Sequence, residues 1–381
     1  MTDRLYYDNA YLTEFDATVL EIRADGMVRL DRSAFYPTSG GQPYDTGTLE
    51  GSRVLDVIVD KGEVWHKVDA PLTEGQSVHG KIDWPRRFDH MQQHGGEHML
   101  AGEVYRQLGG NTIGLHLGHD DSSIDCELPG GRVHLTEEEI RSLEDAVNAH
   151  IQADAPCRCW FPSAEELASL PLRKAPTVTE HVRIVAFGDF EMVACGGTHP
   201  STAGQIGLVK IIDARPARGK LRLTFLCGSR AFADYRLRFD ALGKAAELLS
   251  ARAETFYDNV ARLKEENYAL RMEILKIRRD TALSQVQKAG NSPVLRMVFE
   301  GIGIEALREA AAQAISQGCE YALMASKEEN GHLTVFARSE NAAADMGKLM
   351  RASGCKGGGK PDFAQGRCDD IACLETAEGM L

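Results

Sequence analysis

The sequence lacks the features that define several specialised classes of protein. No apolar run among its 381 residues approaches the ~18 residues that a membrane-spanning helix needs, so we expect no membrane partner. The N-terminus has no basic stretch followed by an apolar core, so we expect no signal peptide. Positive charge is in deficit, because 43 Lys and Arg stand against 56 Asp and Glu and give a net charge of −13. This charge disfavours indiscriminate binding to nucleic acid, although local basic patches are still compatible with a nucleic-acid partner.

A disulfide framework is not expected either. The nine cysteines are odd in number and scattered along the chain. That usage is typical of a reducing compartment, where thiols stay free or bind metal, and we therefore predict a cytoplasmic protein. An apolar fraction of 43% and a charged fraction of 26% exclude wholesale disorder. The length suggests about two or three domains.

Residues 15–83 are predicted to be β-rich, because runs of β-branched residues at 18–22 and 54–59 alternate with turn residues. The turns carry glycines at hairpin-like intervals, namely Gly26, Gly51, Gly62 and Gly75. This pattern favours a small antiparallel barrel or sandwich. We assign residues 1–86 to a β-barrel-like domain.

The next region mixes helices with strands. A helix is predicted over residues 87–108, and a second begins at Thr136, which forms a capping box with Glu139. Ser163 and Glu166 repeat the signal for a shorter helix. Strands are expected near residues 182–186, 206–212 and 221–226. Residues 87–228 are therefore predicted to form an α+β domain.

From residue 229 the apolar residues fall at heptad spacing. Two interleaved series form an a/d seam, one of Leu249, Phe256, Leu263, Leu270 and Ile277, the other of Ala253, Val260, Asn267 and Ile274. A polar break at 250–252 predicts two antiparallel helices, 230–249 and 253–287, in a linker that spans residues 229–290. The linker is either a plain connector or a coiled coil that binds a partner.

The last region, residues 291–381, is predicted to be a small α/β domain. Strands expected at 294–299, 321–325 and 333–336 alternate with helices expected at 304–316 and 342–351. A glycine-rich stretch follows at residues 354–361.

Two short motifs suit a metal ion. His94 and His98 lie at i and i+4, so a helix places both imidazoles on one face, with His90 on the same stripe. The alternative is a row of surface imidazoles. Gly95 and Gly96 each cost the helix about 1 kcal/mol relative to alanine, and close approach of a substrate to the backbone is one possible compensation.

The second motif is Cys195-Gly196-Gly197-Thr198-His199, in which a thiolate and an imidazole flank a tight turn. A buried cysteine near a chance histidine explains it equally well when it is taken alone. Together the two motifs supply three imidazoles and one thiolate, and such soft donors favour zinc. Almost a hundred residues separate the motifs, so the fold must assemble the site. Four firm ligands would be typical of a structural zinc, and three with an open position of a catalytic one.

A third segment, residues 35–47, carries Gly40, Gly41 and Gln42. Its glycines permit a close backbone approach to a ligand, and Gln42 offers both a donor and an acceptor. An ordinary hairpin loop is the alternative.

The three segments F-Y-P-x-S-G-G-Q-P-x-D-x-G, H-x3-H and C-G-G-T-H, in this order, resemble the editing domain of alanyl-tRNA synthetase. The chain looks closest to the free-standing alanyl-tRNA editing proteins of the AlaX family. Residues 357–366 are similar to the glycine-rich signature of the DHHA1-type C-terminal domain, which implies a long form. The β-rich region begins near residue 15 and leaves no room for an aminoacylation domain, so we expect the chain not to be the synthetase. Asp89-His90 is followed by Met91, so the Asp-His-His triad of a phosphodiesterase is missing.

The resemblance implies a function and a site. The fold would be α+β, with an editing domain of the threonyl/alanyl-tRNA synthetase second-domain type, and the activity would be ATP-independent hydrolysis of serine or glycine from tRNA specific for alanine. It implies Zn²⁺ on His94, His98, Cys195 and His199, and catalytic roles for Gln42 and Thr198. Substrate-binding residues would be Gly40, Gly41 and Gln42 for the aminoacyl group, and Arg218, Lys220, Gly357, Gly358, Gly359 and Lys360 for the tRNA.

Several questions stay open at this point. Glu97 departs from the usual motif, and neither it nor His90 receives a role from the resemblance. The C-terminal region either holds tRNA or forms a homodimer. Alternative functions are a zinc-dependent hydrolase of another small ester or amide, and a non-catalytic tRNA-binding protein with a structural zinc.

Overall fold

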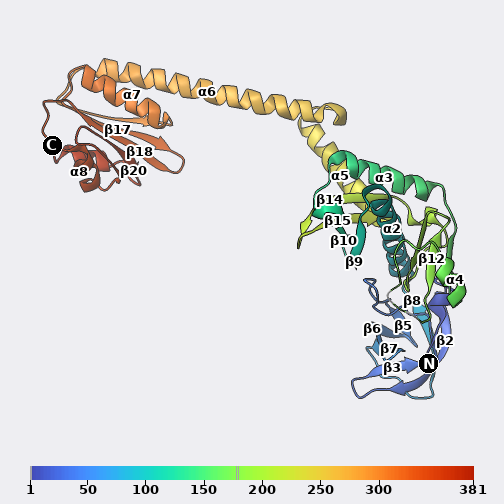
Figure 1. Cartoon of the computed structure of the whole chain (residues 1–381). Helices are drawn as coiled ribbons and strands as arrows, with labels where there is room; N and C mark the ends of the chain where they lie inside the picture. The colour runs from blue at the N-terminus through green and yellow to red at the C-terminus, as the bar shows by residue number, and fades with distance from the viewer. Residues whose placement is uncertain (1, 177, 179) are drawn as a thin grey trace. The chain divides into compact units, whose positions relative to one another are not determined.

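The computed structural model describes residues 2–176, 178 and 180–381. The chain forms two compact units, Met1–Leu242 and Gly243–Leu381, whose elements are labelled in Figure 1. The predicted mixed α+β class is confirmed. Among the described residues, no helix is both long enough and apolar enough to cross a membrane. The division into four domains stays a prediction.

The N-terminal strands close into a barrel whose neighbours pair in the order β2-β3-β7-β6-β5-β8. Their bounds are Glu14–Ile22, Met27–Leu30, Glu63–Val68, Ser52–Asp60, Gly47–Leu49 and Ser77–Ile82. All these pairs are antiparallel. Alternate apolar side chains fill the interior, among them Val19, Leu30, Val57 and Val64. A short β1 (Asp3–Arg4) and α1 (Leu5–Asp8) precede the barrel, and β1 pairs in parallel with β4 (Arg32–Ser33).

The helix α2 (Trp84–Leu108) follows the barrel and carries the first histidine motif. It begins three residues before the predicted start because Pro85 is well suited to the first turn, and it ends at Gly109 in the left-handed conformation. A β-carbon at Gly95 would lie 2.9 Å from Ile206 Cγ1, and one at Gly96 would lie 2.1 Å from Cys227 Sγ. Close packing against other parts of the protein therefore accounts for these glycines, in place of the substrate approach that the sequence left as one possibility.

Two further sheets complete the first unit. A four-stranded antiparallel sheet has the order β14-β15-β10-β9, with bounds Val209–Ala217, Lys220–Cys227, Ser122–Glu127 and Asn111–Leu117. It shares one apolar core with α2 and α3 (Glu137–Gln152). A three-stranded sheet contains β11, β12 and β13, with bounds Cys157–Trp160, Ile184–Phe187 and Glu191–Ala194. Short helices η1, α4 and η2 span Pro129–Gly131, Ala164–Ser169 and Ala203–Ile206.

Two further predicted helix starts in this unit are confirmed. Thr136 and Glu139 form the complete capping box of α3. The Ser163 side chain accepts a hydrogen bond from the Glu166 backbone at the start of α4. The predicted strands at 182–186, 206–212 and 221–226 correspond to β12, β14 and β15, with ends shifted by a few residues.

Both helices of the predicted linker are present, as α5 (Gly228–Leu248) and α6 (Phe256–Ala289), with the short η3 (Ala253–Thr255) between them. Apolar seam residues of α6 are exposed to solvent by 39–57%, namely Val260, Leu263, Leu270, Ile274 and Ile277. Near the C-terminal end of α6, Ala282 and Val286 are buried in the core that α6 shares with α7. Whether α5 and α6 form an antiparallel hairpin stays a prediction.

The C-terminal unit is built on a five-stranded sheet in the order β16-β17-β18-β20-β19. The strands span Val294–Glu300, Tyr321–Glu328, Gly331–Arg338, Phe363–Cys368 and Lys356–Gly359. One face is covered by α7 (Gly303–Ser316) and the other by α8 (Met346–Ala352) and α9 (Cys373–Glu378). The glycine-rich stretch forms the edge strand β19. A β-carbon at Gly357 would lie 2.4 Å from Gly366 Cα, so glycine permits this close pairing with β20.

Candidate metal centre

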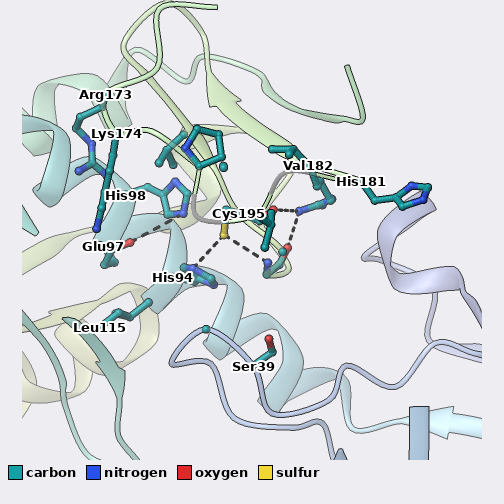
Figure 2. Close-up of a pocket in the computed structure, with 18 of the residues that line it drawn as sticks. Ser39, His94, Glu97, His98, Leu115, Arg173, Lys174, His181, Val182 and Cys195 are labelled. Atoms are coloured by element: carbon teal, nitrogen blue, oxygen red, sulfur yellow. Dashed lines mark hydrogen bonds and ion pairs between the residues drawn. The ribbon is translucent and has the colours of Figure 1, made fainter. Parts of the chain in front are cut away.

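Four side chains predicted from the sequence converge in the first unit. The ligand atoms of His94, His98, Cys195 and His199 all lie within 4.8 Å of one another. Cys195 Sγ is 3.4 Å from His94 Nε2 and 3.3 Å from His199 Nε2. The two histidines of α2 meet the loop that follows β13, as Figure 2 shows for His94, His98 and Cys195. His90 is buried on the same helix but is not part of this group.

The donor spacing fits a tetrahedral soft metal ion. Bond lengths of ~2.3 Å to sulfur and ~2.0 Å to nitrogen place these atoms ~3.5 Å apart around such an ion. The observed sulfur–nitrogen distances of 3.3 and 3.4 Å are close to that value. The Nδ1 atoms of His98 and His199 are buried and make no hydrogen bond within the described part of the chain.

The protonation states of these groups also fit a cation. Burial lowers the pKa of His94 to about 3 and lowers the pKa of His98 and of His199 well below the usual value. The imidazoles are therefore neutral and able to donate a lone pair. Burial raises the pKa of Cys195 to about 12. A bound cation would offset this effect, because metal coordination deprotonates a thiol.

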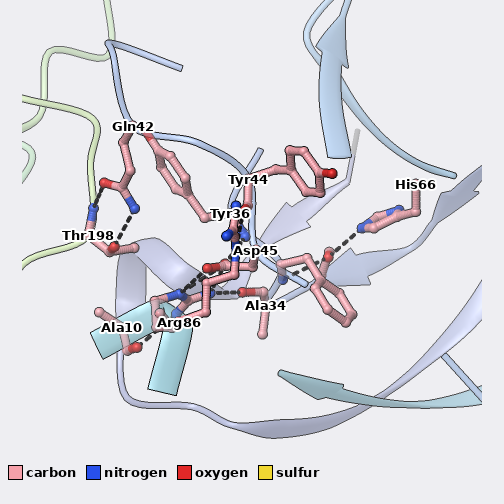
Figure 3. Close-up of polar contacts among 12 residues, drawn as sticks. Ala10, Ala34, Tyr36, Gln42, Tyr44, Asp45, His66, Arg86 and Thr198 are labelled. Atoms are coloured by element: carbon pink, nitrogen blue, oxygen red, sulfur yellow. Dashed lines mark hydrogen bonds and ion pairs between the residues drawn. The ribbon is translucent and has the colours of Figure 1, made fainter. Parts of the chain in front are cut away.

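Gln42 links the motif loop, residues 35–47, to both ligand motifs, and Figure 3 shows its contacts with Thr198. Its Oε1 accepts a hydrogen bond from His94 Nδ1 at 2.9 Å and from the Thr198 backbone at 3.2 Å. Its Nε2 donates to Thr198 Oγ1 at 2.8 Å. A proton on His94 Nδ1 leaves Nε2 free for a metal, so Gln42 fixes the tautomer that a ligand requires. Gln42 and Thr198 are fully buried, and neither lines the adjacent pocket.

The motif loop is anchored to α2 by a buried ion pair that sequence reasoning missed. Arg87 Nε lies 2.9 Å from both carboxylate oxygens of Asp45, and both side chains are fully buried. Asp45 also accepts a hydrogen bond from the Tyr36 backbone at 2.6 Å, and Arg87 donates to the Ala34 carbonyl at 2.5 Å. Figure 3 shows these contacts around Asp45. The only signal in the sequence was Asp45 itself, because a carboxylate requires a partner of opposite charge once it is buried.

A second residue that the sequence analysis missed is Arg183, which holds the cysteine loop, residues 195–199. Its Nη1 donates to the carbonyls of Cys195 at 3.0 Å and Gly197 at 2.9 Å. Gly197 itself has no room for a side chain, because a β-carbon there would lie 2.2 Å from His94 Cε1. The loop therefore closes directly over the first ligand. No local sequence pattern identifies Arg183, since its partners are backbone carbonyls twelve and fourteen residues away.

The metal group opens onto a pocket of about 650 Å³. His94, His98 and Cys195 contribute to its wall, together with Glu97 and with Ser39 and Gly40 of the motif loop. Burial raises the pKa of Glu97 to about 7. Much of the remaining wall is aromatic or cationic, formed by Arg4, Tyr7, Tyr36, Phe161, Arg173, Lys174 and Arg183. The pocket thus presents ring surfaces and positive charge next to the metal group.

Arg218 and Lys220, which the resemblance implies contact tRNA, lie in a basic stretch whose charges are largely neutralised by carboxylates. Lys220 Nζ lies 2.8 Å from Glu127, Arg222 lies 2.7 Å from Asp125, and Arg215 lies 3.0 Å from Asp213. Arg218 occupies the exposed two-residue turn between β14 and β15, with a φ of 51°. Gly357, Gly358, Gly359 and Lys360 belong to the C-terminal unit. The structure of the first unit therefore joins the ligand set with Gly40, Gln42 and Thr198, and leaves Arg218 and Lys220 on a separate hairpin.

Comparison with known proteins agrees with this arrangement. Residues 7–86 match the family tRNA synthetases class II (A), and residues 182–223 match the Threonyl and Alanyl tRNA synthetase second additional domain. Alanyl-tRNA editing protein AlaX-L of Pyrococcus horikoshii is 30% identical over 97% of this chain and 95% of its own length. The chain belongs to the alanyl-tRNA editing protein family. Alanyl-tRNA editing protein Aarsd1 of Danio rerio is 28% identical over 98% of this chain and 95% of its own.

A longer relative shares the same region. Alanine–tRNA ligase of Pyrococcus abyssi is 33% identical over 99% of this chain, and the chain spans 43% of the length of that ligase. This alanyl-tRNA editing protein therefore corresponds to less than half of the ligase.

Proposed function

We propose that this chain hydrolyses the ester that joins serine or glycine to tRNA specific for alanine, as a cytoplasmic, ATP-independent enzyme. The observation that carries this proposal is the group of four metal-binding side chains opening onto a pocket of about 650 Å³, in a member of the alanyl-tRNA editing protein family. Water would add to the carbonyl carbon of the ester, and the products would be the free amino acid and the ribose hydroxyl of the tRNA.

Zinc is the proposed cofactor, held by His94, His98, Cys195 and His199, because one thiolate and three imidazoles are donors that zinc favours. When bound, the ion supplies a Lewis acid next to the ester. Gln42 and Thr198 act through the ligands. Gln42 keeps the proton of His94 on Nδ1, and Thr198 holds the Gln42 amide in place from both sides.

The amino acid is proposed to lie between the metal group and the motif loop. Ser39 and Gly40 line the pocket at this point. Gly40 has open space around it, whereas a β-carbon at Gly41 would lie 2.5 Å from the Leu115 carbonyl oxygen. Gly41 therefore lets the loop pack against β9, and Gly40 faces the substrate. A site that hydrogen-bonds the serine hydroxyl strongly rejects an analogue that lacks it, which would spare alanyl-tRNA. Glycine also lacks that hydroxyl, so glycyl-tRNA would be the slower of the two proposed substrates.

The 3′ end of the tRNA is proposed to enter along the aromatic and cationic wall. The rings of Tyr7 and Phe161 lie 5.7 Å apart and offer a stacking surface for an unpaired base. Arg4 and Lys174 supply positive charge on the same wall. Arg218, Lys220, Gly357, Gly358, Gly359 and Lys360 are proposed to contact the body of the tRNA. The exposed apolar seam of α6 would instead support a homodimer.

A deacylation assay tests this function. The full chain is incubated with seryl-, glycyl- and alanyl-tRNA specific for alanine, with and without a chelator, and with a free seryl ester as the competing substrate. We expect turnover of seryl-tRNA or glycyl-tRNA that the chelator abolishes and zinc restores, with alanyl-tRNA spared. Preferential cleavage of the free ester would indicate a small-ester hydrolase. Binding of tRNA without any turnover would indicate a non-catalytic protein with a structural zinc.

A further inference from the structure

A second cluster of potential metal ligands lies in the C-terminal unit. The sulfur atoms of Cys355, Cys368 and Cys373 all lie within 4.8 Å of one another. The three residues are only 5%, 4% and 7% exposed. They belong to the core between the sheet and the helices α8 and α9. The proposed function uses none of them.

The strand register explains how these residues meet. Cys368 ends β20, and β18 places His332 directly opposite it. On its other side, β19 pairs Lys356 with Arg367, so one further step of that ladder puts Cys355 opposite Cys368. Directly opposed residues point to the same face of a sheet. The register therefore places Cys355, Cys368 and His332 in one row. Cys373, at the start of α9, lies with its sulfur within 4.8 Å of the other two sulfur atoms.

One side chain of this row has a polar atom without an ordinary partner. His332 Nδ1 is buried and makes no hydrogen bond to any described residue. Ser353 Oγ lies 3.7 Å from Cys355 Sγ.

We propose that Cys355, Cys368 and Cys373 form a second metal site, in which three thiolates bind a thiophilic divalent cation such as Zn²⁺ and His332 supplies the fourth donor. Two cysteines can satisfy each other by a disulfide, but a third sulfur in the same cluster cannot join that bond. Three thiolates and one imidazole are a donor set typical of a structural zinc. The ion would fasten the glycine-rich edge strand β19 and the start of α9 to the sheet.

Metal analysis of the full-length protein tests the proposal. The chain is purified anaerobically, supplied with zinc and dialysed, and we expect about two zinc ions per chain, one in each four-donor set. Cys368→Ser should lower this content by about one ion while zinc-dependent deacylation of a mischarged minihelix persists. Cys319→Ser is the matched control, because Cys319 is a buried cysteine of the same unit outside the cluster. It should retain both ions. An unchanged zinc content in Cys368→Ser would overturn the proposal, whether the wild type holds one ion or two.

A second measurement does not depend on how well the cysteine variant folds. Cadmium is titrated into a Cys195→Ala chain, which lacks the only thiol of the first metal group. We expect thiolate-to-cadmium charge-transfer absorption of the strength that about three thiolates give. The absorption should saturate when one cadmium ion is bound to the three-cysteine cluster. Absent absorption overturns the proposal. A disulfide mapped by mass spectrometry between two of Cys355, Cys368 and Cys373 also overturns it, because that bond would take the place of the metal. Mapping is needed because Cys157 Sγ and Cys159 Sγ also lie only 4.0 Å apart. Deacylation is not the readout here, so failure of this site is distinguishable from failure of the proposed function.

Discussion

The two units each carry a cluster of metal-binding side chains, and the clusters differ in how their donors are held. In the first unit three imidazoles and one thiol come from α2 and a distant loop, Gln42 and Arg183 orient them, and they border a pocket. In the second unit three thiols fall within residues 355–373 and lie in an apolar core. A polar, oriented set beside a cavity suits reaction chemistry, whereas a buried thiolate set suits structural support. We therefore expect the two clusters of metal-binding side chains to serve different purposes, one in the reaction and one in structural support.

The sharpest test of this contrast removes a ligand of the first cluster. Cys195→Ala and His98→Ala should each lower kcat/KM for mischarged tRNA by at least ~100-fold, because weakening the support of a metal ligand alone costs ~10–100-fold. Binding of uncharged tRNA should hardly change, since the ligands act at the ester. Filter binding and single-turnover deacylation give the two quantities. Loss of tRNA binding as well would mean that the first metal holds the fold, as we propose for the second.

A shortened chain tests the division of labour between the units. The first unit extends into α5, where Arg230 forms an ion pair with Asp89 at 2.5 Å and donates to the Gly118 carbonyl. We therefore place the cut after Leu242, so that these contacts remain. The shortened chain should keep its metal and deacylate a minihelix, while KM for full-length tRNA rises by ~100-fold, as expected when one of two linked binding modules is removed.

The mass of the shortened and full-length proteins in solution is recorded in the same experiment. An unchanged KM together with a change from dimer to monomer would show that the C-terminal unit serves assembly through the apolar seam of α6 and does not hold tRNA.

Two neighbouring glycines give a matched pair for the geometry of the first cluster. Gly197→Ala should lower zinc affinity by ~10–100-fold, because its β-carbon would overlap the His94 ring and move a ligand. Gly196→Ala is the control, since its β-carbon would meet only Tyr7 Oη at an ordinary 3.5 Å. Competition with a chromophoric chelator measures both affinities. Equal affinities in the two variants would show that the loop adjusts and that His94 is not fixed by this contact.

The smallest expected effect concerns a buried histidine outside both clusters. His66 accepts a hydrogen bond from Ser33 and donates to the Val28 carbonyl in the barrel core, and burial lowers its pKa to about 4. In the unfolded chain the His66 imidazole binds a proton near pH 6.5, whereas in the folded chain it does so only near pH 4. The contribution of His66 to the free energy of unfolding is therefore fully present above pH 6.5 and is lost as the pH falls toward 4. Between pH 7 and pH 5 the loss is about 2 kcal/mol. The free energy of unfolding is measured by denaturant titration at pH 7 and pH 5 for the wild type and for His66→Gln. The wild type should lose about 2 kcal/mol more than the variant between the two pH values, and an equal loss in both proteins would contradict the prediction.

Local spacing was enough to predict much of the first cluster. A helix brings residues four apart onto one face, so spacing made His94 and His98 candidate ligands, and Thr136 and Glu139 defined a helix start for the same local reason. Spacing alone left surface imidazoles as an alternative, and the family resemblance implied all four ligands, including Cys195 and His199. Spacing could not decide why Gly95 and Gly96 are glycines, because glycine permits close packing against protein as readily as against a ligand, and here the neighbours are protein.

The sequence by itself determined the helices, the two ligand motifs and the family, since each depends on residues near one another along the chain. Only the tertiary structure decided that Gln42 orients His94 across 52 positions and that Arg183 holds the cysteine loop. It also decided that Cys355 and Cys368 share a row with His332 and that Cys373 meets the two other cysteines. The physical reason is that backbone periodicity fixes which neighbours share a face, whereas strand register and core packing fix which distant side chains come within bonding distance.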